Sequence, residues 1–201
     1  MWDERFARDG YLFGTEPADF LRREAGRLAP ASRLLCIADG EGRNSVWLAG
    51  QGHSVVAMDG SAVGMAKARR LAADRGVTVE THVADIADWD WTARPYDAVV
   101  AIFIQFAPPP LRDRIFAGLQ AALRPGGLIL LHGYTPEQIA LGTGGPRAVE
   151  QLYTPALLRA AFAGMEILRL AAYRAEVDEG EGHSGPSALI DLVARKPGQG
   201  S

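Results

Sequence analysis

Short apolar runs recur along the chain and alternate with segments of helical periodicity. The runs are rich in valine, isoleucine and leucine and do not alternate strictly with polar residues, a pattern typical of strands buried on both faces. Because helical segments separate most of the runs, we predict a mostly parallel sheet with right-handed crossover connections. The predicted strands are 33–38, 54–59, 78–84, 98–104, 127–132, 166–173 and 188–194, and the predicted helices are 18–28, 43–50, 62–75, 110–123 and 154–162.

The last two predicted strands differ from the others because no helical segment separates them. The stretch between them, 176–187, is acidic and rich in glycine, so we predict an antiparallel hairpin at this point. At the other end of the chain, residues 1–30 are aromatic and charged, and we predict a cap segment that packs outside a main domain of residues 31–196. Residues 197–201 are predicted to form a flexible tail.

The composition limits the type of protein and the kinds of binding partner that we expect. The 201 residues, 48% hydrophobic and 22% charged, are typical of one soluble globular domain, and the formal charge of −3 provides no basic surface for nucleic acid. The single cysteine, Cys36, excludes an internal disulfide, and the histidines form no spaced metal motif. The start of the chain lacks a signal-peptide pattern, and the longest apolar run is too short to span a bilayer. We therefore predict a cytoplasmic protein with a small-molecule partner, no metal, and no nucleic-acid or membrane partner, and we leave the oligomeric state open.

The segment 34–45 combines a strand-like run, an acidic turn with two glycines and the start of a helix. Gly40 and Gly42 allow the backbone to approach a ligand closely, and a helix N-terminus favours a carboxylate. The carboxylates of Asp39 and Glu41 would repel a pyrophosphate but suit a cationic ligand, and S-adenosylmethionine carries both a sulfonium and an ammonium. An ordinary strand-to-helix turn is the alternative. The predicted cofactor contacts in this loop are Ala38, Asp39, Gly40, Gly42 and Asn44.

Two further carboxylates follow predicted strands. Asp59 ends a strand about twenty residues after the glycines, where a carboxylate can accept hydrogen bonds from both ribose hydroxyls. Asp85 follows the next strand, where it can accept a hydrogen bond from an adenine amino group while Ile86 packs on the ring. The alternatives are a helix N-cap for Asp59 and an ordinary loop residue for Asp85. The predicted cofactor contacts in this part of the chain are Asp59, Gly60, Ser61, Asp85, Ile86 and Ile102.

Taken in order, these segments resemble the class I S-adenosylmethionine-dependent methyltransferases from about residue 33 to residue 196. A narrower likeness to the tellurite-resistance and thiopurine-methyltransferase-like branch rests on the stretches 11–21, 40–44, 142–146 and 181–185. The resemblance implies an α/β fold: a Rossmann-like three-layer sandwich with a seven-stranded, mostly parallel sheet and an antiparallel last strand. It also implies S-adenosyl-L-methionine laid across the strand ends, with the N-terminal cap closing above it.

Three positions depart from the family pattern. Cys36 stands where the family usually has an acidic residue, Ala38 replaces the first glycine of the loop, and Gln105 stands where a histidine often appears. Ala38 adds a methyl group near the expected methionine end of the cofactor, so weaker binding or a reshaped loop is one expectation. A cofactor-binding protein without turnover is therefore an alternative to an active methyltransferase.

The sequence contains no evident catalytic dyad. Methyl transfer from a sulfonium is an in-line displacement, and soft nucleophiles such as thiolates or chalcogen oxyanions need little help from a general base. The prediction is therefore an S-adenosylmethionine-dependent methyltransferase acting on such a small molecule, with substrate-side candidates Arg43, Gln105 and His183. The alternatives are a loop-closing role for Arg43, a buried strand end for Gln105 and a solvated loop position for His183. The segment Gly40-x-Gly42-x-x-Ser45 nearly matches the dinucleotide-binding fingerprint. It therefore also permits an NAD-dependent oxidoreductase, which we favour less.

Overall fold

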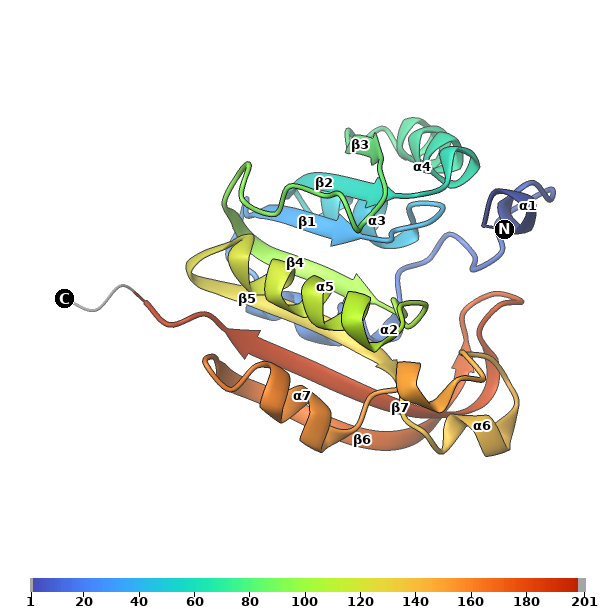
Figure 1. The fold of residues 1–201 in the computed structure, drawn as a ribbon. Coiled ribbons are helices and arrows are strands. Elements are labelled where there is room, and N and C mark those ends of the chain that lie inside the picture. The colour runs from blue at the N-terminus through green and yellow to red at the C-terminus, as the bar shows by residue number, and fades with distance from the viewer. Residues whose placement is uncertain (1, 199–201) are drawn as a thin grey trace.

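A seven-stranded sheet runs through the centre of the protein, with helices on both faces (Figure 1). The computed structural model describes residues 2–198, so residues 199–201 of the predicted tail lie outside the described residues. The strands are β1 (Arg33–Ile37), β2 (Ser54–Asp59), β3 (Glu80–Val83), β4 (Tyr96–Ile102), β5 (Leu123–Tyr134), β6 (Glu166–Asp178) and β7 (Ser184–Arg195). The helices are α1 (Trp2–Phe6), α2 (Asp19–Glu24), α3 (Arg43–Gly50), α4 (Ala62–Asp74), α5 (Pro109–Ala121), α6 (Gln138–Leu141) and α7 (Pro155–Ala161), with short 3-10 helices at Ala25–Arg27 and Val149–Gln151. Within this described part of the chain, no helix has the length and hydrophobicity needed to cross a membrane.

The strand order is β3-β2-β1-β4-β5-β7-β6. Strands β1 to β5 pair in parallel, whereas β7 lies antiparallel between β5 and β6. The predicted fold class, a Rossmann-like α/β sandwich with an antiparallel last strand, is therefore confirmed. The strand order reverses between β1 and β4, and open α/β sheets bind ligands in the crevice outside the carboxyl ends of the strands at such a point.

The structure contains every predicted strand and helix, and the differences lie at their ends. The bounds of β2 and α3 agree with the prediction. The largest difference lies in the hairpin, where β6 continues to Asp178 and β7 begins at Ser184. Continuous pairing of the two strands up to this point leaves only residues 179–183 as the turn. The acidic, glycine-rich composition of 176–187 indicated a longer loop because composition does not reveal cross-strand pairing.

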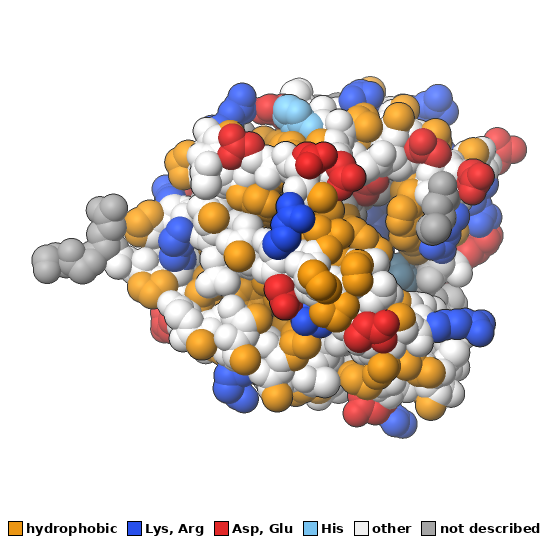
Figure 2. Space-filling model, in the orientation of Figure 1, with side chains coloured by type: hydrophobic (Ala, Val, Ile, Leu, Met, Phe, Trp, Pro, Cys, Tyr) orange, Lys and Arg blue, Asp and Glu red, His pale blue; other side chains and the backbone are white. Residues whose placement is uncertain are grey.

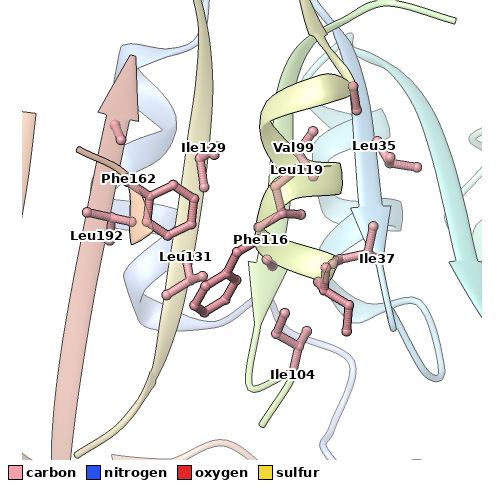
Figure 3. Close-up of a cluster of buried hydrophobic side chains, with 14 of the residues drawn as sticks. Leu35, Ile37, Val99, Ile104, Phe116, Leu119, Ile129, Leu131, Phe162 and Leu192 are labelled. Atoms are coloured by element: carbon pink, nitrogen blue, oxygen red, sulfur yellow. The ribbon is translucent and has the colours of Figure 1, made fainter. Parts of the chain in front are cut away.

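Side chains of the central strands alternate between two hydrophobic layers. In β1, Leu35 and Ile37 belong to the layer covered by α5 and α7, whereas Leu34 and Cys36 belong to the layer covered by α2 and α3. Figure 3 shows the first layer, where side chains of α5 lie over those of the strands. Both faces of the central parallel strands β1, β2, β4 and β5 are therefore buried, which explains their continuous apolar sequences, whereas the edge strand β3 is partly exposed.

The N-terminal segment covers two different parts of the domain. Helix α2 buries Phe20 and Leu21 in the second hydrophobic layer. Helix α1 instead lies beyond the carboxyl ends of the strands, beside α4 (Figure 1), where the Ser61 hydroxyl donates a hydrogen bond to the carboxylate of Asp3. The first part of the segment is therefore the part that covers the strand ends.

Cys36 lies in an apolar environment that has no place for a charge. Its side chain is 1% exposed and sits opposite Ala57 of β2 and Val100 of β4. Burial holds the pKa of the Cys36 thiol well above its ordinary value, so the thiol stays neutral. The acidic residue of the family pattern would here enter a hydrophobic layer.

We expect Cys36→Asp to lower the free energy of unfolding by at least about 2 kcal/mol at pH 7, because the new carboxyl group has no buried hydrogen-bond partner. Chemical denaturation of the purified variants measures this loss. Cys36→Val is the matched control, and we expect it to cost less than about 1.5 kcal/mol because it keeps the site apolar. Equal stability of Cys36→Asp and the wild type would contradict the prediction.

Candidate active site

A cavity of about 680 Å³ opens outside the carboxyl ends of the parallel strands. Its volume lies within the range of about 300–1,000 Å³ found for small-molecule sites. Residues of the N-terminal segment, the strand ends, the loop after α6 and the β6–β7 turn form its walls. Figure 2 shows hydrophobic side chains exposed together over the α5 side of the protein, and this band continues toward the end of the molecule where the strands finish.

The loop between β1 and α3 has an unusual backbone. Ala38 has φ +46°, a left-handed conformation that costs an alanine about 1 kcal/mol or more. Gly42 has φ +90°, and a Cβ atom at that position would lie 2.6 Å from the Cβ of Ala68 in α4. Gly42 is therefore required for the packing of the loop against α4, and it does not line the cavity.

Asp39 lines the cavity as a buried carboxyl group that accepts a hydrogen bond from the hydroxyl of Ser45. Burial raises the pKa of Asp39 to about 7; the nearby carboxylate of Asp59 contributes to this rise, whereas the Ser45 hydrogen bonds and the charge of Arg43 oppose it. A positively charged ligand in the cavity would favour the ionised form of Asp39.

Asp59 connects the two loops at the acidic side of the cavity. One carboxylate oxygen accepts a hydrogen bond from the Gly40 N–H at 2.9 Å, and the other accepts one from the Ser61 N–H at 2.8 Å. Burial raises the pKa of Asp59, and these two backbone hydrogen bonds oppose that shift. Ser61 itself caps α4 by accepting a hydrogen bond from the Gly64 N–H at 2.9 Å. Ser61 and Gly40 therefore hold the Asp59 carboxylate in place but do not line the cavity themselves.

Glu41 does not line the cavity, although the sequence places it in the same acidic loop. Its two carboxylate oxygens accept hydrogen bonds from the Leu12 N–H at 2.7 Å and from the Lys67 ammonium at 2.9 Å. The expectation that Glu41 adds negative charge around the ligand is therefore wrong. The cause is the tight turn at the glycines, which directs this side chain toward α4 and the N-terminal segment.

The structure brings most of the predicted cofactor contacts together in one wall. Asp85 and Ile86 follow β3, and Ile102 ends β4. Asn44 also faces the cavity, and its side-chain oxygen accepts a hydrogen bond from the Ala18 N–H at 3.0 Å. The predicted contacts that line the cavity are Ala38, Asp39, Asn44, Asp59, Gly60, Asp85, Ile86 and Ile102, and those that do not are Gly40, Gly42 and Ser61.

His183 is buried in the cavity wall, so the solvated alternative is wrong for this residue. Its imidazole stacks between the rings of Phe13 and Phe103, with centroid distances of 4.5 and 4.1 Å, and Nδ1 lies 2.6 Å from the Tyr134 hydroxyl oxygen. Burial lowers the pKa of His183 to about 3, and the charge of Arg43 acts in the same direction. The imidazole is therefore neutral at pH 7. The sequence did not indicate this because the burial comes from Phe13 of the N-terminal segment and Phe103 after β4, which are distant in the sequence.

Gln105 lines the cavity, but its amide group is held by the main chain. Its side-chain nitrogen donates to the Tyr134 carbonyl at 2.8 Å, and its side-chain oxygen accepts from the Tyr134 N–H at 2.6 Å. Both ends of the amide are thus occupied. Gln105 shapes the wall between β4 and β5 and has little capacity left to hold a substrate.

Arg43 is the first residue of α3 and reaches across to the β6–β7 turn. Its Nη2 donates to the Glu179 carboxylate at 2.7 Å, and both side chains are 8% exposed. Its Nη1 is buried and has no hydrogen-bond partner among residues 2–198. This residue therefore joins the two sides of the cavity and keeps one donor unused.

Several residues of the wall were missed by sequence reasoning. They include Trp2 and Arg5 of α1, Met58 of β2 and Gln151. Their types and positions carry no local signal for a ligand, because the fold of the N-terminal segment and the connections brings them to the cavity. Among the described residues, no group of three or more His, Cys, Asp or Glu side chains is arranged to hold a metal ion.

The sequence of the chain is similar to those of known methyltransferases. Residues 34–127 match the model of a methyltransferase domain. A glycine/sarcosine N-methyltransferase from Halorhodospira halochloris is 32% identical over 137 residues, which are 65% of this chain and 47% of that protein. The chain thus spans about half the length of this curated relative.

Solved structures share the fold at low sequence identity. TehB from Haemophilus influenzae superposes with a TM-score of 0.70 at 19% identity, over 89% of this chain and 61% of that one. The N-methyltransferase NodS from Bradyrhizobium japonicum WM9, in complex with S-adenosyl-L-homocysteine, superposes with a TM-score of 0.73 at 14% identity, over 98% of this chain and 96% of that one. Residues 34–127 therefore match a methyltransferase domain, and the whole chain shares the fold of these solved structures.

The raised pKa of Asp39 predicts how stability depends on pH. Between pH values of about 4 and 7 the carboxyl ionises in the unfolded chain but stays protonated in the folded protein, so its contribution to stability falls as pH rises. We expect Asp39→Asn to gain stability relative to the wild type over this range, by up to about 4 kcal/mol, and to show a constant difference at higher pH. Urea unfolding from about pH 4 to about pH 9 measures the difference.

Ser45→Ala provides the matched control for this measurement. This substitution removes a hydrogen bond that lowers the pKa of Asp39, so the pKa should rise further. The stability of Ser45→Ala should therefore continue to fall with rising pH to a higher pH than that of the wild type. Parallel stability profiles for Asp39→Asn and the wild type would show that the carboxyl has an ordinary pKa.

The backbone of Ala38 predicts a stabilising substitution. Ala38→Gly should relieve about 1 kcal/mol of strain and raise the Tm by about 2–4 °C, as measured by calorimetry. Ala31→Gly, at φ +54° and outside the cavity wall, should give a similar gain, whereas Ala49→Gly inside α3 should lower the Tm. A gain for Ala31→Gly without one for Ala38→Gly would contradict the prediction.

Proposed function

We propose that this protein transfers a methyl group from S-adenosylmethionine to a small-molecule nucleophile. The observation that supports this most is the uneven distribution of charge around the cavity. Asp39, Asp59 and Asp85 stand at the ends of β1, β2 and β3, whereas Arg43 turns away from them toward the β6–β7 turn, where His183 lies. A cationic cofactor is attracted to the acidic side, which leaves the other side for the methyl acceptor.

The residues of the acidic side suit an adenosine with a charged sulfur. Asp59 retains lone pairs beyond its two backbone hydrogen bonds and would accept from the ribose hydroxyls. Ile86 and Ile102 would pack against the adenine, with Asp85 at its edge. Asp39, the carboxyl nearest the first strand, would face the positively charged end. When bound, the cofactor supplies a methyl group that is electrophilic because it is attached to a sulfonium.

The remaining walls indicate how the chain would assist the acceptor. Trp2 and Phe13 of the N-terminal segment and the His183 imidazole cover the cavity with aromatic surface, which excludes water and strengthens electrostatic interactions inside. At pH 7 the His183 imidazole is neutral, and its lowered pKa of about 3 makes it a weak base toward the acceptor. Catalysis would rest mainly on holding a soft or already deprotonated nucleophile against the methyl group.

The enclosed site supports a small acceptor rather than a macromolecule. Side chains from α1 and the β6–β7 turn stand in the cavity wall, and the loop after α6 contributes Gly144, Gly145 and Pro146. The curated relative is named for glycine and sarcosine, both small amines. Small amines therefore belong beside thiols and chalcogen oxyanions among the acceptors to test.

Binding and turnover test the proposal in sequence. In titration calorimetry we expect S-adenosylhomocysteine to bind and NADH not to bind, and we expect Asp59→Asn to weaken S-adenosylhomocysteine binding at least about tenfold. Radiolabelled S-adenosylmethionine should then transfer its methyl group to at least one of glycine, sarcosine, a small thiol, selenite or tellurite. Glu41→Gln is the matched control, because this carboxylate belongs to the same loop but faces away from the cavity.

The outcomes separate the alternatives. Binding of NADH alone would overturn the proposal in favour of an oxidoreductase. Binding of S-adenosylhomocysteine without methylation of any acceptor in the panel would favour a cofactor-binding protein without turnover. Equal loss of binding in Asp59→Asn and Glu41→Gln would indicate that the loop as a whole, rather than the Asp59 carboxylate, holds the ligand.

A further inference from the structure

The His183 imidazole presents one edge to the cavity while its other contacts are occupied. The rings of Phe13 and Phe103 cover its two faces, and Nδ1 lies 2.6 Å from the Tyr134 hydroxyl oxygen. The other ring nitrogen, Nε2, has no hydrogen-bond partner among residues 2–198, and it is not one of the fully buried unpaired nitrogens of this part of the chain. Because His183 lines the cavity and only the edge of its ring is uncovered, the accessible Nε2 faces the cavity.

The Tyr134 hydroxyl determines which nitrogen of the imidazole carries the proton. Burial raises the pKa of Tyr134, so the phenol keeps its proton at neutral pH. The side chain is buried, and His183 Nδ1 is the one hydrogen-bond partner of its hydroxyl in the described part of the chain. If Nδ1–H donated to the hydroxyl oxygen, the phenol proton would have no acceptor, which is costly in a buried site. The hydroxyl therefore donates to Nδ1, and the proton of the neutral imidazole is on Nε2.

This arrangement gives the cavity a neutral hydrogen-bond donor at a fixed position. The imidazole is neutral because the pKa of His183 is lowered to about 3, and its one remaining polar atom, Nε2–H, can donate but cannot accept. The nearby guanidinium of Arg43 does not replace it, because it is paired with the Glu179 carboxylate at 2.7 Å. A ligand atom that reaches the edge of the imidazole must therefore carry a lone pair. Among aromatic rings, away from water, such a hydrogen bond is stronger than in solution.

We infer that His183 determines specificity on the acceptor side of the cavity by donating a hydrogen bond from Nε2 to an oxygen or an unprotonated nitrogen of the ligand. Tyr134 is the positioning residue that holds the imidazole in this form. The inference rests on the proposed function, since it concerns the side of the cavity that the cofactor leaves for the methyl acceptor. A carbonyl oxygen and a ring nitrogen share the required lone pair, whereas an ammonium group has none. An acceptor that presents only an ammonium group to His183 does not fit this site.

Nitrogen-15 NMR of histidine-labelled protein tests the position of the proton without any ligand. The wild type should carry it on Nε2 of His183, and Tyr134→Phe should populate the Nδ1–H form because Nδ1 no longer accepts a hydrogen bond. The resonances are assigned by their disappearance in His183→Gln. Tyr173→Phe is the matched control, because its hydroxyl donates to Asp191 outside the cavity wall, and it should leave the His183 resonances unchanged. A wild-type imidazole that is protonated on Nδ1 would overturn the inference.

Two rings of nearly equal size test the need for a lone pair. Pyridine has a ring nitrogen that accepts a hydrogen bond and is unprotonated at neutral pH, whereas benzene has none. S-adenosylhomocysteine is added first, in excess, so that the cofactor side is filled. We expect the wild-type complex to bind pyridine about 3- to 10-fold more tightly than benzene, which is the factor of one neutral hydrogen bond. Ligand-observed NMR titrations measure both affinities.

Substitutions of His183 distinguish its two nitrogens. The amide of a glutamine reaches about the position of Nε2, whereas the amide of an asparagine reaches about that of Nδ1. His183→Gln should therefore keep the preference for pyridine, and both His183→Asn and His183→Leu should bind the two rings equally. Once a methyl acceptor is found, kcat/KM should follow the same order, with His183→Gln close to the wild type and His183→Leu lower by about tenfold.

Retention of the wild-type preference for pyridine in His183→Leu would overturn the inference, and so would its retention in His183→Asn together with its loss in His183→Gln. A wild-type complex that binds both rings equally, or neither of them, would overturn it as well. Failure of the wild type to bind S-adenosylhomocysteine is a different result, because it removes the proposed function and leaves the NMR measurement of the imidazole proton intact. Melting temperatures measured without ligand identify any variant that fails to fold.

Discussion

The Asp59 carboxylate is the interaction on which the cavity most depends. It accepts hydrogen bonds from the backbone N–H groups of Gly40 and Ser61, so a single side chain holds the loop after β1 beside the loop after β2. Ser61 in turn caps α4 and binds Asp3 of α1. The position of the N-terminal helix over the strand ends therefore depends on the same carboxylate that lines the cavity. Asp59 remains buried in this position although burial raises the pKa of its carboxyl group.

The opposite side of the cavity is held by aromatic stacking and one buried ion pair. Phe103 follows β4 with φ +55°, an uncommon conformation that places its ring against His183. Phe13 covers the other face of the imidazole, and Arg43 joins Glu179 of the β6–β7 turn. Each contact joins segments that are far apart in the sequence. The shape of the cavity is thus a product of the whole fold.

Most of the fold could be predicted from the sequence because strands that are buried on both faces consist of consecutive apolar residues. Strand β2 and helix α3 have the predicted bounds, and Thr154 and Pro155 mark the start of α7. Within the site, Asp59 and Asp85 could be located because they follow strands, and parallel strands end at one edge of a sheet. Glu41, Gln105 and His183 could not be assigned, because their orientation depends on backbone turns and on partners contributed by other elements.

The sequence by itself determined the alternation of strands and helices, the antiparallel hairpin at the end, and the acidic loop that follows the first strand. These features follow from hydrophobic periodicity and turn chemistry, which act over a few residues. Only the tertiary structure decided which charged groups face the cavity. It turned Glu41 away from the cavity, buried His183 as a neutral imidazole and paired Arg43 with Glu179 of the β6–β7 turn. The physical reason is that the direction and ionisation of a side chain depend on packing and dielectric surroundings that distant segments create.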